Sequence, residues 1–185
     1  MDRWGWIEED QAVFIVIDVQ EGLIKAMDEE VGRTVIRNVQ TLLSLAKEMA
    51  IPVVSTEQYP KGLGGTVSEI KKELLTESIE KTSFTCCRVE AFKERLDSLG
   101  RRQVILSGIE THICVLQTCS DLVDKGYEVH VAADAVCSRR KLDWEIGLRW
   151  MEKKGAIIST TEMIAFQLLK EAGTEKFKRL SKRFK

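Results

Sequence analysis

Three residues whose side chains can do acid, base or nucleophilic chemistry stand beside apolar runs of the sequence. Asp18 directly follows the run VFIVI, Lys81 lies in a short mid-chain segment, and Cys114 comes soon after the run VIL. A cysteine can serve as a nucleophile, a lysine can stabilise nearby negative charge, and an aspartate can accept the thiol proton and return it to a leaving group. Together these groups suffice for acyl transfer.

The position of Cys114 suggests how its thiol would be activated. We expect it in the first turn of a helix at about 111–125, where free backbone N–H groups and the helix dipole favour the thiolate and lower the pKa. A neighbouring Lys81 ammonium would lower that pKa further. Each residue also has an ordinary interpretation, because cysteines are often small buried hydrophobes, lysines are mostly solvated and aspartates at strand ends cap helices. Position alone leaves both interpretations open.

Apolar runs that alternate with helical periodicity predict the elements that would position these residues. Strands are expected at 13–17, from 53 onward, and at 80–84, 104–106, 128–132 and 156–159, and helices at 31–49, 67–75, 89–99, 111–125, 142–153 and 162–171. The Gly- and Pro-rich stretch 59–65 predicts a surface loop, and Ser107-Gly108 is expected to end the fourth strand.

Continuous apolar strands are typical of a parallel sheet that is buried on both faces. We therefore predict an α/β fold: a single doubly wound domain over 1–185, with a six-stranded parallel sheet and helices on both faces. Ligand sites in such sheets lie at the carboxyl ends of the strands, which is where the three candidate residues fall.

Charge and composition exclude several classes of protein. Lys and Arg number 28 against 29 Asp and Glu, so there is no overall field to attract nucleic acid or an anionic membrane, and we predict neither as a partner. Residues 1–6 lack a secretory pattern, and five irregularly placed cysteines are typical of reduced thiols, so we predict a cytoplasmic protein. The basic segment 176–185 is interpreted as a solvated, partly docked helix end, with a membrane or RNA patch as the alternative.

Three motifs in chain order resemble those of the isochorismatase-like cysteine hydrolases: IDVQ at 17–20, EKTSF at 80–84 and GIETHICV at 108–115. Two further segments, STEQYPKGLG at 55–64 and VAADAVCSR at 131–139, are similar to the isochorismatase-domain-containing subgroup. The resemblance spans nearly the whole chain. It implies a six-stranded parallel sheet flanked by helices, and a homo-oligomer.

The resemblance also assigns roles to individual residues. It implies that Asp18, Lys81 and Cys114 form a catalytic triad, and that Cys114 carries a thioester or related acyl intermediate. It further implies a cis peptide bond between Ile109 and Glu110, and an oxyanion hole made by the N–H groups of Glu110 and Cys114.

One departure from the family concerns metal binding. The nicotinamidase branch holds a divalent metal through an aspartate and two histidines in the loop after the second strand, but the corresponding TEQYP at 56–60 contains no histidine. We therefore predict no metal and no cofactor. Of the two histidines, His112 is two residues from Cys114 and would face another direction on a helix, so a structural or oligomer-contact role is expected. His130, in an apolar strand pattern, is expected in the core or at an edge.

Other residues are expected around the pocket or at the surface. Tyr59 and Phe84 are predicted as apolar walls of a small-molecule pocket, and Gln20 or Thr111 as its polar edge, with core packing as the alternative for Phe84. The adjacent cysteines at 86 and 87 are expected to line the core or the pocket. Two tryptophans, at 144 and 150, are six residues apart on one helix and should face different ways, so at least one could serve an interface.

These observations favour a metal-independent cysteine hydrolase that acts on a small amide, carbamoyl or related compound through a covalent Cys114 intermediate. One alternative is hydrolysis of an isochorismate-type vinyl ether, with Asp18 as the acid. The other is a non-catalytic scaffold whose cysteine senses oxidants or ligands. The same residues fit all three hypotheses.

Overall fold

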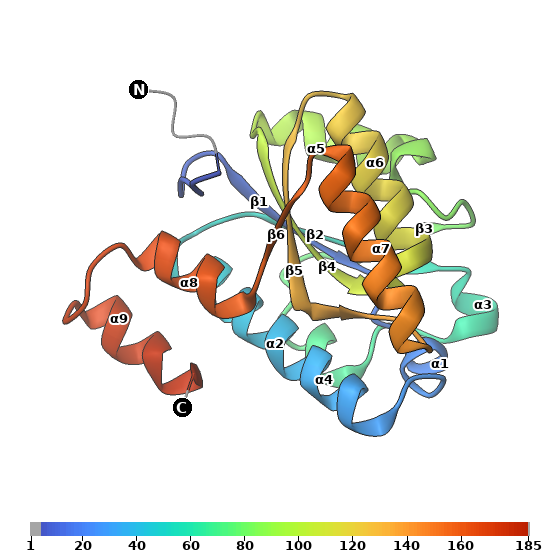
Figure 1. The fold of residues 1–185 in the computed structure, drawn as a ribbon, viewed down its shortest axis with the longest axis horizontal. Helices are drawn as coiled ribbons and strands as arrows, with labels where there is room; N and C mark the ends of the chain where they lie inside the picture. Colours follow the sequence, from blue (N-terminus) through green and yellow to red (C-terminus); the bar gives the residue numbers. More distant parts are fainter. Residues whose placement is uncertain (1–4, 185) are drawn as a thin grey trace.

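The computed structural model describes residues 5–184, so the first four residues of the predicted N-terminal pattern and Lys185 of the basic segment lie outside the described residues. Six parallel strands form one sheet in the order β3-β2-β1-β4-β5-β6 (Figure 1). Their bounds are β1 Ala12–Ile17, β2 Val53–Gln58, β3 Ile79–Lys81, β4 Gln103–Ile109, β5 Glu128–Cys137 and β6 Ile157–Ser159. The predicted fold class is confirmed.

Helices cover both faces of this sheet (Figure 1). One face is covered by α2 Glu29–Glu48, α4 Ser68–Lys71, α8 Thr161–Leu169 and α9 Glu175–Leu180, and the other by α5 Glu90–Leu99, α6 Leu116–Asp124 and α7 Lys141–Lys154. The shorter elements are α1 Glu21–Ile24, α3 Pro60–Leu63, the 3-10 turns η1 Cys86–Arg88 and η3 Ser181–Phe184, and the π-helical turn η2 Thr111–Val115.

The central strand β1 shows why the run VFIVI forms this architecture. Every residue of β1 is buried, and the side chains alternate between the two hydrophobic layers. Phe14 and Val16 enter the layer under α2, whereas Val13, Ile15 and Ile17 enter the layer under α5 and α6. A strand that is apolar at every position is therefore stable only with helices on both of its faces.

Three expected elements differ in extent from the structure. The helix expected at 67–75 is reduced to the single turn α4, since Leu75 is exposed and the apolar spacing is not sustained. The loop at 59–65 contains the turn α3, which starts on a proline as helices readily do. The strand expected at 80–84 is β3, which ends at Lys81, so residues 82–84 follow it outside the strand.

The expectation that Ser107-Gly108 ends the fourth strand is wrong, because β4 continues to Ile109. Gly108 has φ 122°, and a Cβ placed on it would lie 1.9 Å from the carbonyl oxygen of Ile17. The two backbones pass so closely that only glycine fits. The register between β4 and β5 also shifts here, which re-aims the end of β4 beside the end of β1.

The C-terminal helix α9 is docked on the body of the protein by Leu180, which is buried. Arg179 pairs with Glu48 of α2, and Lys176 lies 3.7 Å from Glu9. This agrees with a partly docked helix end. Across residues 5–184, no helix is both long enough and apolar enough to cross a membrane.

Candidate active site

Asp18 stands at the carboxyl end of β1, at the centre of the sheet, and is fully buried. Its backbone has φ 52°, a left-handed conformation that non-glycine residues adopt rarely. One carboxylate oxygen, Oδ1, accepts a 2.7 Å hydrogen bond from Thr56 Oγ1, and the other, Oδ2, accepts a 2.6 Å bond from Lys81 Nζ. The carboxylate is therefore held in one orientation by two neighbouring strands.

Lys81 ends the edge strand β3, and its side chain is as buried as that of Asp18. Besides Asp18, its ammonium donates to Gln58 Oε1 at 2.7 Å and to the carbonyl oxygen of Phe84 at 3.2 Å. An ammonium has three donors, and each has an acceptor here. Lys81 is thus a fixed, desolvated cation beside the Asp18 carboxylate.

Cys114 lies in the π-helical turn η2 that follows β4, and is 5% exposed. Its thiol lies close enough to the Asp18 carboxylate for the two groups to shift each other's pKa. Burial, followed by the negative charge of Asp18, raises the pKa of this thiol to about 12, although the Lys81 charge acts in the opposite direction. The predicted lowering of the Cys114 pKa is therefore wrong: desolvation and the carboxylate outweigh the ammonium, and the resting form is the thiol.

The charges of Asp18 and Lys81 are set by the same desolvated surroundings. Burial raises the pKa of Asp18, and the Lys81 charge, the hydrogen bond from Thr56 and the nearby Cys114 thiol counteract this only in part. Burial is the largest single influence on Lys81 and lowers its pKa, but the negative charge of Asp18, smaller contributions from Cys114 and Cys86, and the hydrogen bond to Asp18 together raise the pKa overall. A carboxylate with a raised pKa beside a thiol is suited to accept the thiol proton.

The turn that precedes Cys114 is held from outside the sheet. The peptide bond between Ile109 and Glu110 is cis, at the position that the resemblance implied. The Glu110 carboxylate accepts hydrogen bonds from the backbone N–H and the Nε of Arg139, at 3.1 and 3.0 Å. His112 Nδ1 lies 2.9 Å from Ser138 Oγ. The segment after β5 therefore fixes both sides of the nucleophile turn, and His112 has a structural contact.

The predicted pocket residues fall into different environments. Tyr59 and Phe84 are 54% and 53% exposed, so the core-packing alternative for Phe84 is wrong. The backbones of both residues contact Lys81: Tyr59 N–H donates to its carbonyl oxygen, and the Phe84 carbonyl oxygen accepts from its ammonium. Thr111 is buried with its hydroxyl lacking a hydrogen-bond partner among the described residues. Gln20 is fully buried, and its amide bonds to the backbone of Gln58 and to the Gly64 carbonyl oxygen. Gln20 thus holds the loop after β2 and offers little to a ligand.

Two residues of the site escaped the sequence reasoning: Thr56 and Gln58. Thr56 and Gln58 are alternate residues of β2, which pairs with both β1 and β3, and they reach Asp18 and Lys81 from the same side. Polar residues at the end of a strand between the other two could have been a signal. Cys86 is buried 3.9 Å from Thr56 Oγ1, and burial raises its pKa to about 12.

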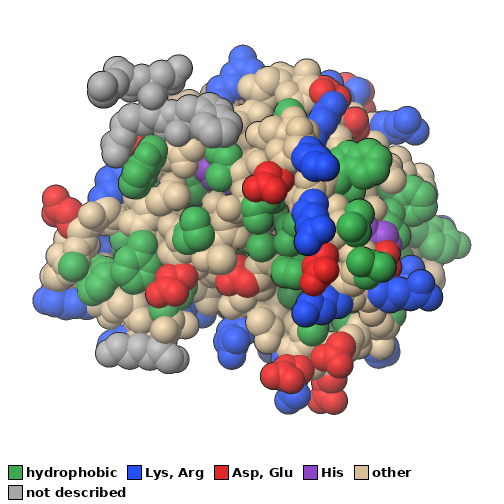
Figure 2. Space-filling model, viewed as in Figure 1, with side chains coloured by type: hydrophobic (Ala, Val, Ile, Leu, Met, Phe, Trp, Pro, Cys, Tyr) green, Lys and Arg blue, Asp and Glu red, His purple; other side chains and the backbone are tan. Residues whose placement is uncertain are grey.

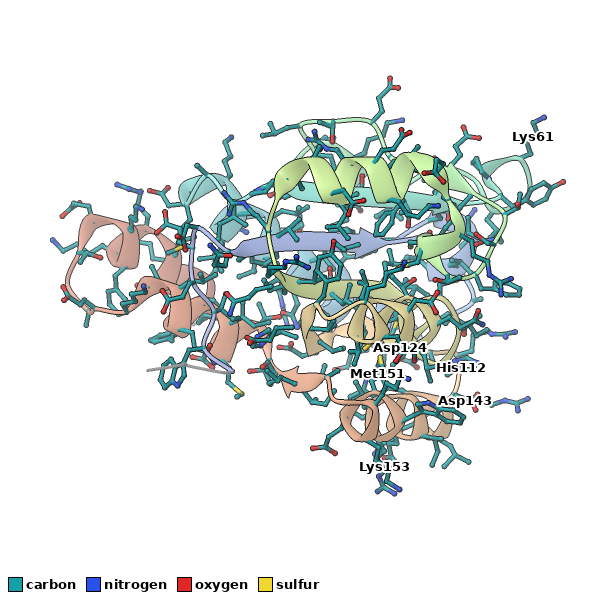
Figure 3. The ribbon with its side chains drawn as sticks, turned by 90° about the horizontal axis from the view of Figure 1, so that it is seen from above. Lys61, His112, Asp124, Asp143, Met151 and Lys153 are labelled. Atoms are coloured by element: carbon teal, nitrogen blue, oxygen red, sulfur yellow. The ribbon has the colours of Figure 1, made fainter. Side chains whose placement is uncertain are left out.

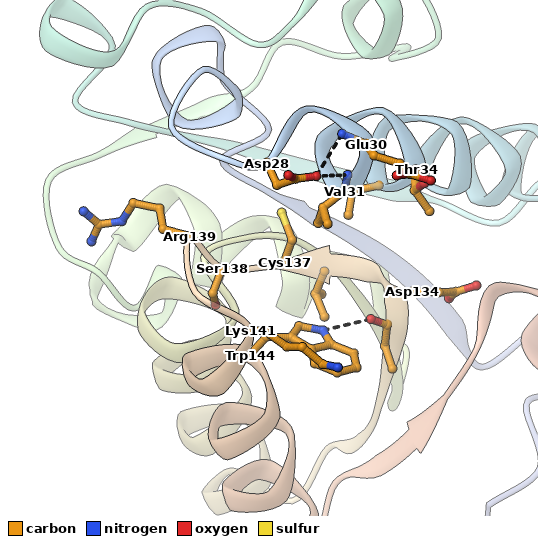
Figure 4. Close-up of a pocket in the computed structure, with 13 residues that line it drawn as sticks. Asp28, Glu30, Val31, Thr34, Asp134, Cys137, Ser138, Arg139, Lys141 and Trp144 are labelled. Carbon is orange, nitrogen blue, oxygen red and sulfur yellow. Dashed lines mark hydrogen bonds between the residues drawn. The ribbon is translucent and has the colours of Figure 1, made fainter.

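A cavity of about 560 Å³ lies beside this site, between the N-terminus of α2, the end of β5 and the start of α7 (Figure 4). The Trp144 indole lines it and donates to the carbonyl oxygen of Ala133 at 3.1 Å. Neither Asp18, Lys81 nor Cys114 is among its lining residues. The cavity and the three candidate catalytic residues therefore lie in different places.

Histidines and other possible metal ligands are scattered. In the described part of the chain, His, Cys, Asp and Glu side chains form no group of three or more that could hold a metal ion. His130 is buried in β5, as expected for a core residue, and its Nε2 lies 3.0 Å from Glu128.

Comparison with protein families matches the isochorismatase domain over residues 12–163. The secreted isochorismatase effector Isc1 of Phytophthora sojae is 40% identical, over 99% of this chain and 89% of its own. Isochorismatase domain-containing protein 2 of Xenopus laevis is 38% identical, over 97% of this chain and 86% of its own.

Solved structures extend the comparison to the fold. The MAR1 ribonuclease from Caenorhabditis elegans is 35% identical, with a TM-score of 0.88 over 97% of this chain and 92% of that one. The Escherichia coli YcaC product, described as an octameric hydrolase of unknown specificity, is 21% identical, with a TM-score of 0.90 over 99% of this chain and 92% of that one. The second likeness concerns the fold alone. On the family match and the two relatives, this chain belongs to the isochorismatase family and is similar to its isochorismatase-domain-containing proteins.

Proposed function

We propose that this member of the isochorismatase hydrolase family is a cysteine hydrolase that cleaves a small amide, carbamoyl or related compound through a covalent intermediate on Cys114. The observation that carries the proposal is one buried carboxylate next to both a thiol and an ammonium: Asp18 accepts a hydrogen bond from Lys81, and its charge acts on the buried thiol of Cys114. An ion pair with a purely structural role does not require a thiol beside its carboxylate. A carboxylate that accepts the proton of a nucleophile does require one.

The geometry supports a sequence of proton transfers centred on Asp18. As Cys114 Sγ attacks the substrate carbonyl carbon, Asp18 takes the thiol proton, and Lys81 keeps the site electrically balanced. The N–H groups of Glu110 and Cys114 are the proposed donors to the oxyanion. Asp18 then gives its proton to the leaving amine, which departs and leaves a thioester. A water molecule, deprotonated by Asp18, hydrolyses the thioester, and the returning proton restores the thiol.

A raised thiol pKa does not oppose this mechanism. A thiolate formed in advance would place two negative charges beside one ammonium, and burial makes this costly. Transfer of the proton to Asp18 during attack avoids that state, since the pair keeps a single negative charge throughout. The nucleophile is consequently activated only when an electrophile is present.

The experiment is a substrate panel of small amides, carbamates, isochorismate and an RNA oligonucleotide, assayed with Cys114→Ala and Asp18→Asn. The RNA arm is included because a similar structure is described as a ribonuclease. Cys119→Ala is the matched control, as Cys119 is buried in the helix that follows the same turn. We expect Cys114→Ala to lose turnover and the adduct seen by intact-protein mass spectrometry, and Cys119→Ala to retain both.

The alternatives give different results in the same panel. Vinyl ether hydrolysis by acid catalysis should survive Cys114→Ser and be lost only in Asp18→Asn. A ligand- or oxidant-sensing scaffold should turn over no member of the panel, while Cys114 still reacts with peroxide. Retained turnover of an amide by Cys114→Ala would refute the covalent mechanism.

We also propose that the whole chain, 1–185, forms a single isochorismatase-like domain that self-associates and works without metal or cofactor. Self-association is supported by the octameric YcaC neighbour, and metal independence by the missing histidines after β2. We retain the cytoplasm as the proposed location on the reduced cysteines, although the Phytophthora sojae relative is described as secreted. Turnover that persists after dialysis against a chelator would support the metal-independent proposal.

A further inference from the structure

Helix α7 carries an apolar stripe that the fold leaves uncovered. Leu142, Ile146 and Trp150 are spaced four residues apart, so they share one side of the helix, and they are 65%, 48% and 59% exposed. The opposite side of α7 is the packed one: Met151 points into the protein, whereas Lys153 points away from it (Figure 3). The stripe therefore contributes nothing to the core of this chain.

The stripe borders a shallow hollow of about 490 Å³, lined by Ile146, Arg149, Trp150, Lys153 and Lys154. Hydrophobic, basic and acidic side chains are mixed on the part of the surface that α7 occupies (Figure 2). An exposed tryptophan next to an arginine, with aliphatic residues along one helix, has the composition of the centre of a protein interface.

Charge along α7 changes sign from one end of the stripe to the other. Asp143 and Glu145 outnumber Lys141 in the first half of α7, and Arg149, Lys153 and Lys154 outnumber Glu152 in the second half. Within the chain, Lys141 already pairs with Glu145, and Lys154 with Asp124. A parallel partner helix would set like charges against each other. An antiparallel copy of the same helix would set the acidic half against the basic half twice, because a two-fold axis repeats every contact.

We propose that α7 is the surface through which two copies of this chain pair, antiparallel and centred on Ile146. The proposal rests on the self-association proposed above and names the surface that carries it. With Ile146 at the two-fold axis, Leu142 of each copy lies against the hollow beside Trp150 of the other. On the flank of the stripe, Glu145 of each copy lies within about one helical turn of Arg149 of the other.

Pairing at this surface would also reach the nucleophile turn. Gly147, on the inner side of α7, packs so closely on that turn that a Cβ there would lie 3.2 Å from His112 Cα and 3.3 Å from Thr111 Cγ2. The helix that forms the interface is therefore the helix that supports the turn carrying Cys114.

The first test is the mass of the particle in solution, by size-exclusion chromatography with light scattering and by sedimentation velocity. The wild-type chain should form a dimer or a multiple of dimers, and Ile146→Glu should raise the dissociation constant of the α7 contact at least about 30-fold, the effect of losing one interface hot spot. The matched control is Met163→Glu, which places the same charge on α8 at a residue that is 50% exposed, and it should leave the mass unchanged.

The second test separates pairing from folding by exchanging charges. Glu145→Arg and Arg149→Glu should each weaken association, because each sets like charges across the two-fold axis, and the double variant should regain it. Circular dichroism and thermal unfolding should be those of the wild type in every variant, since all three positions are on the outer side of α7.

Three results would overturn the proposal. The wild-type chain could be a monomer at tens of micromolar, or the Ile146→Glu particle could have the wild-type mass. The third result is a double variant that associates no more tightly than the single variants. A monomer would refute self-association altogether, whereas an unchanged oligomer in Ile146→Glu would refute this surface only. Hydrolase activity is tested separately by Cys114→Ala, so the failure of either proposal can be told from the failure of the other.

Discussion

Replacing Lys81 by methionine should destabilise the protein by about 3–5 kcal/mol at neutral pH. The side chains of Lys81 and Asp18 are completely buried, and their charged atoms are 2.6 Å apart. Methionine fills most of the volume of the lysine stem, so the loss comes mainly from the Asp18 carboxylate, which stays buried without its cation. Thr56 still donates to that carboxylate, which places the expected loss at the lower end of the range.

The pH dependence of the stability lost in Lys81→Met identifies the cause of that loss. Burial already raises the pKa of Asp18 in the wild type, and without the Lys81 charge that pKa rises further. A group whose folded-state pKa is raised stabilises the fold below its unfolded pKa, and the contribution disappears as the pH rises through the folded pKa. The stability difference between wild type and Lys81→Met should therefore shrink as the pH falls from 8 toward 5.

Urea unfolding measures both effects without knowledge of the substrate. The double variant Lys81→Met with Asp18→Asn removes both charges and should recover most of the loss. Lys93→Met is the matched control: it breaks the exposed pair with Glu90 and should leave the stability nearly unchanged. A Lys81→Met protein within about 1 kcal/mol of wild type, or a difference that grows at acid pH, would refute this account of the pair.

Other predictions follow from single contacts. Alkylation of Cys114 by iodoacetamide should accelerate steadily with pH up to at least pH 9, because the thiol pKa is raised to about 12, and a plateau near neutrality would contradict this. Asp18→Asn should speed that alkylation at pH 8 at least about tenfold, since it removes a charge that raises the thiol pKa. Gly108→Ala should cost more than about 3 kcal/mol in chemical unfolding, because its Cβ would overlap the β1 backbone; a smaller cost would mean that β4 can move. Arg139→Leu should lower kcat/KM by releasing Glu110 from the nucleophile turn, while stability falls by about 1 kcal/mol or less, as Arg139 is more than half exposed.

The sequence predicted the structure best where one physical effect decides the conformation. A strand such as VFIVI has no polar face, so burial on both sides follows from its composition, and the six-stranded parallel sheet is the consequence. The helical stretch at 31–49 was predicted almost to its ends, because Asp28 caps the first turn of α2 and the apolar spacing persists over five turns.

Predictions from the sequence failed where neighbours decide the outcome. Ser107-Gly108 has the composition of a break, but β1 lies close enough to accept a glycine inside β4. Gln20 has the composition of a ligand-binding amide, but the loop after β2 uses all of its hydrogen bonds. In both places the deciding partner is distant in sequence, so no local pattern could reveal it.

The thiol of Cys114 is the clearest case in which different effects shift a pKa in opposite directions. Its place in the turn after β4 favours the thiolate by a dipole effect of less than about 2 kcal/mol, and the sequence suggested this effect and the Lys81 charge, which both lower the pKa. Burial and the adjacent Asp18 carboxylate act in the opposite direction, and the pKa shows that they win. The activating element is then the pair of Asp18 and Lys81, because it can take up the thiol proton without adding charge to a buried site. Turnover of a substrate by Cys114 should accordingly require the Asp18 carboxylate, whereas alkylation of its thiolate should follow the pH of the solvent.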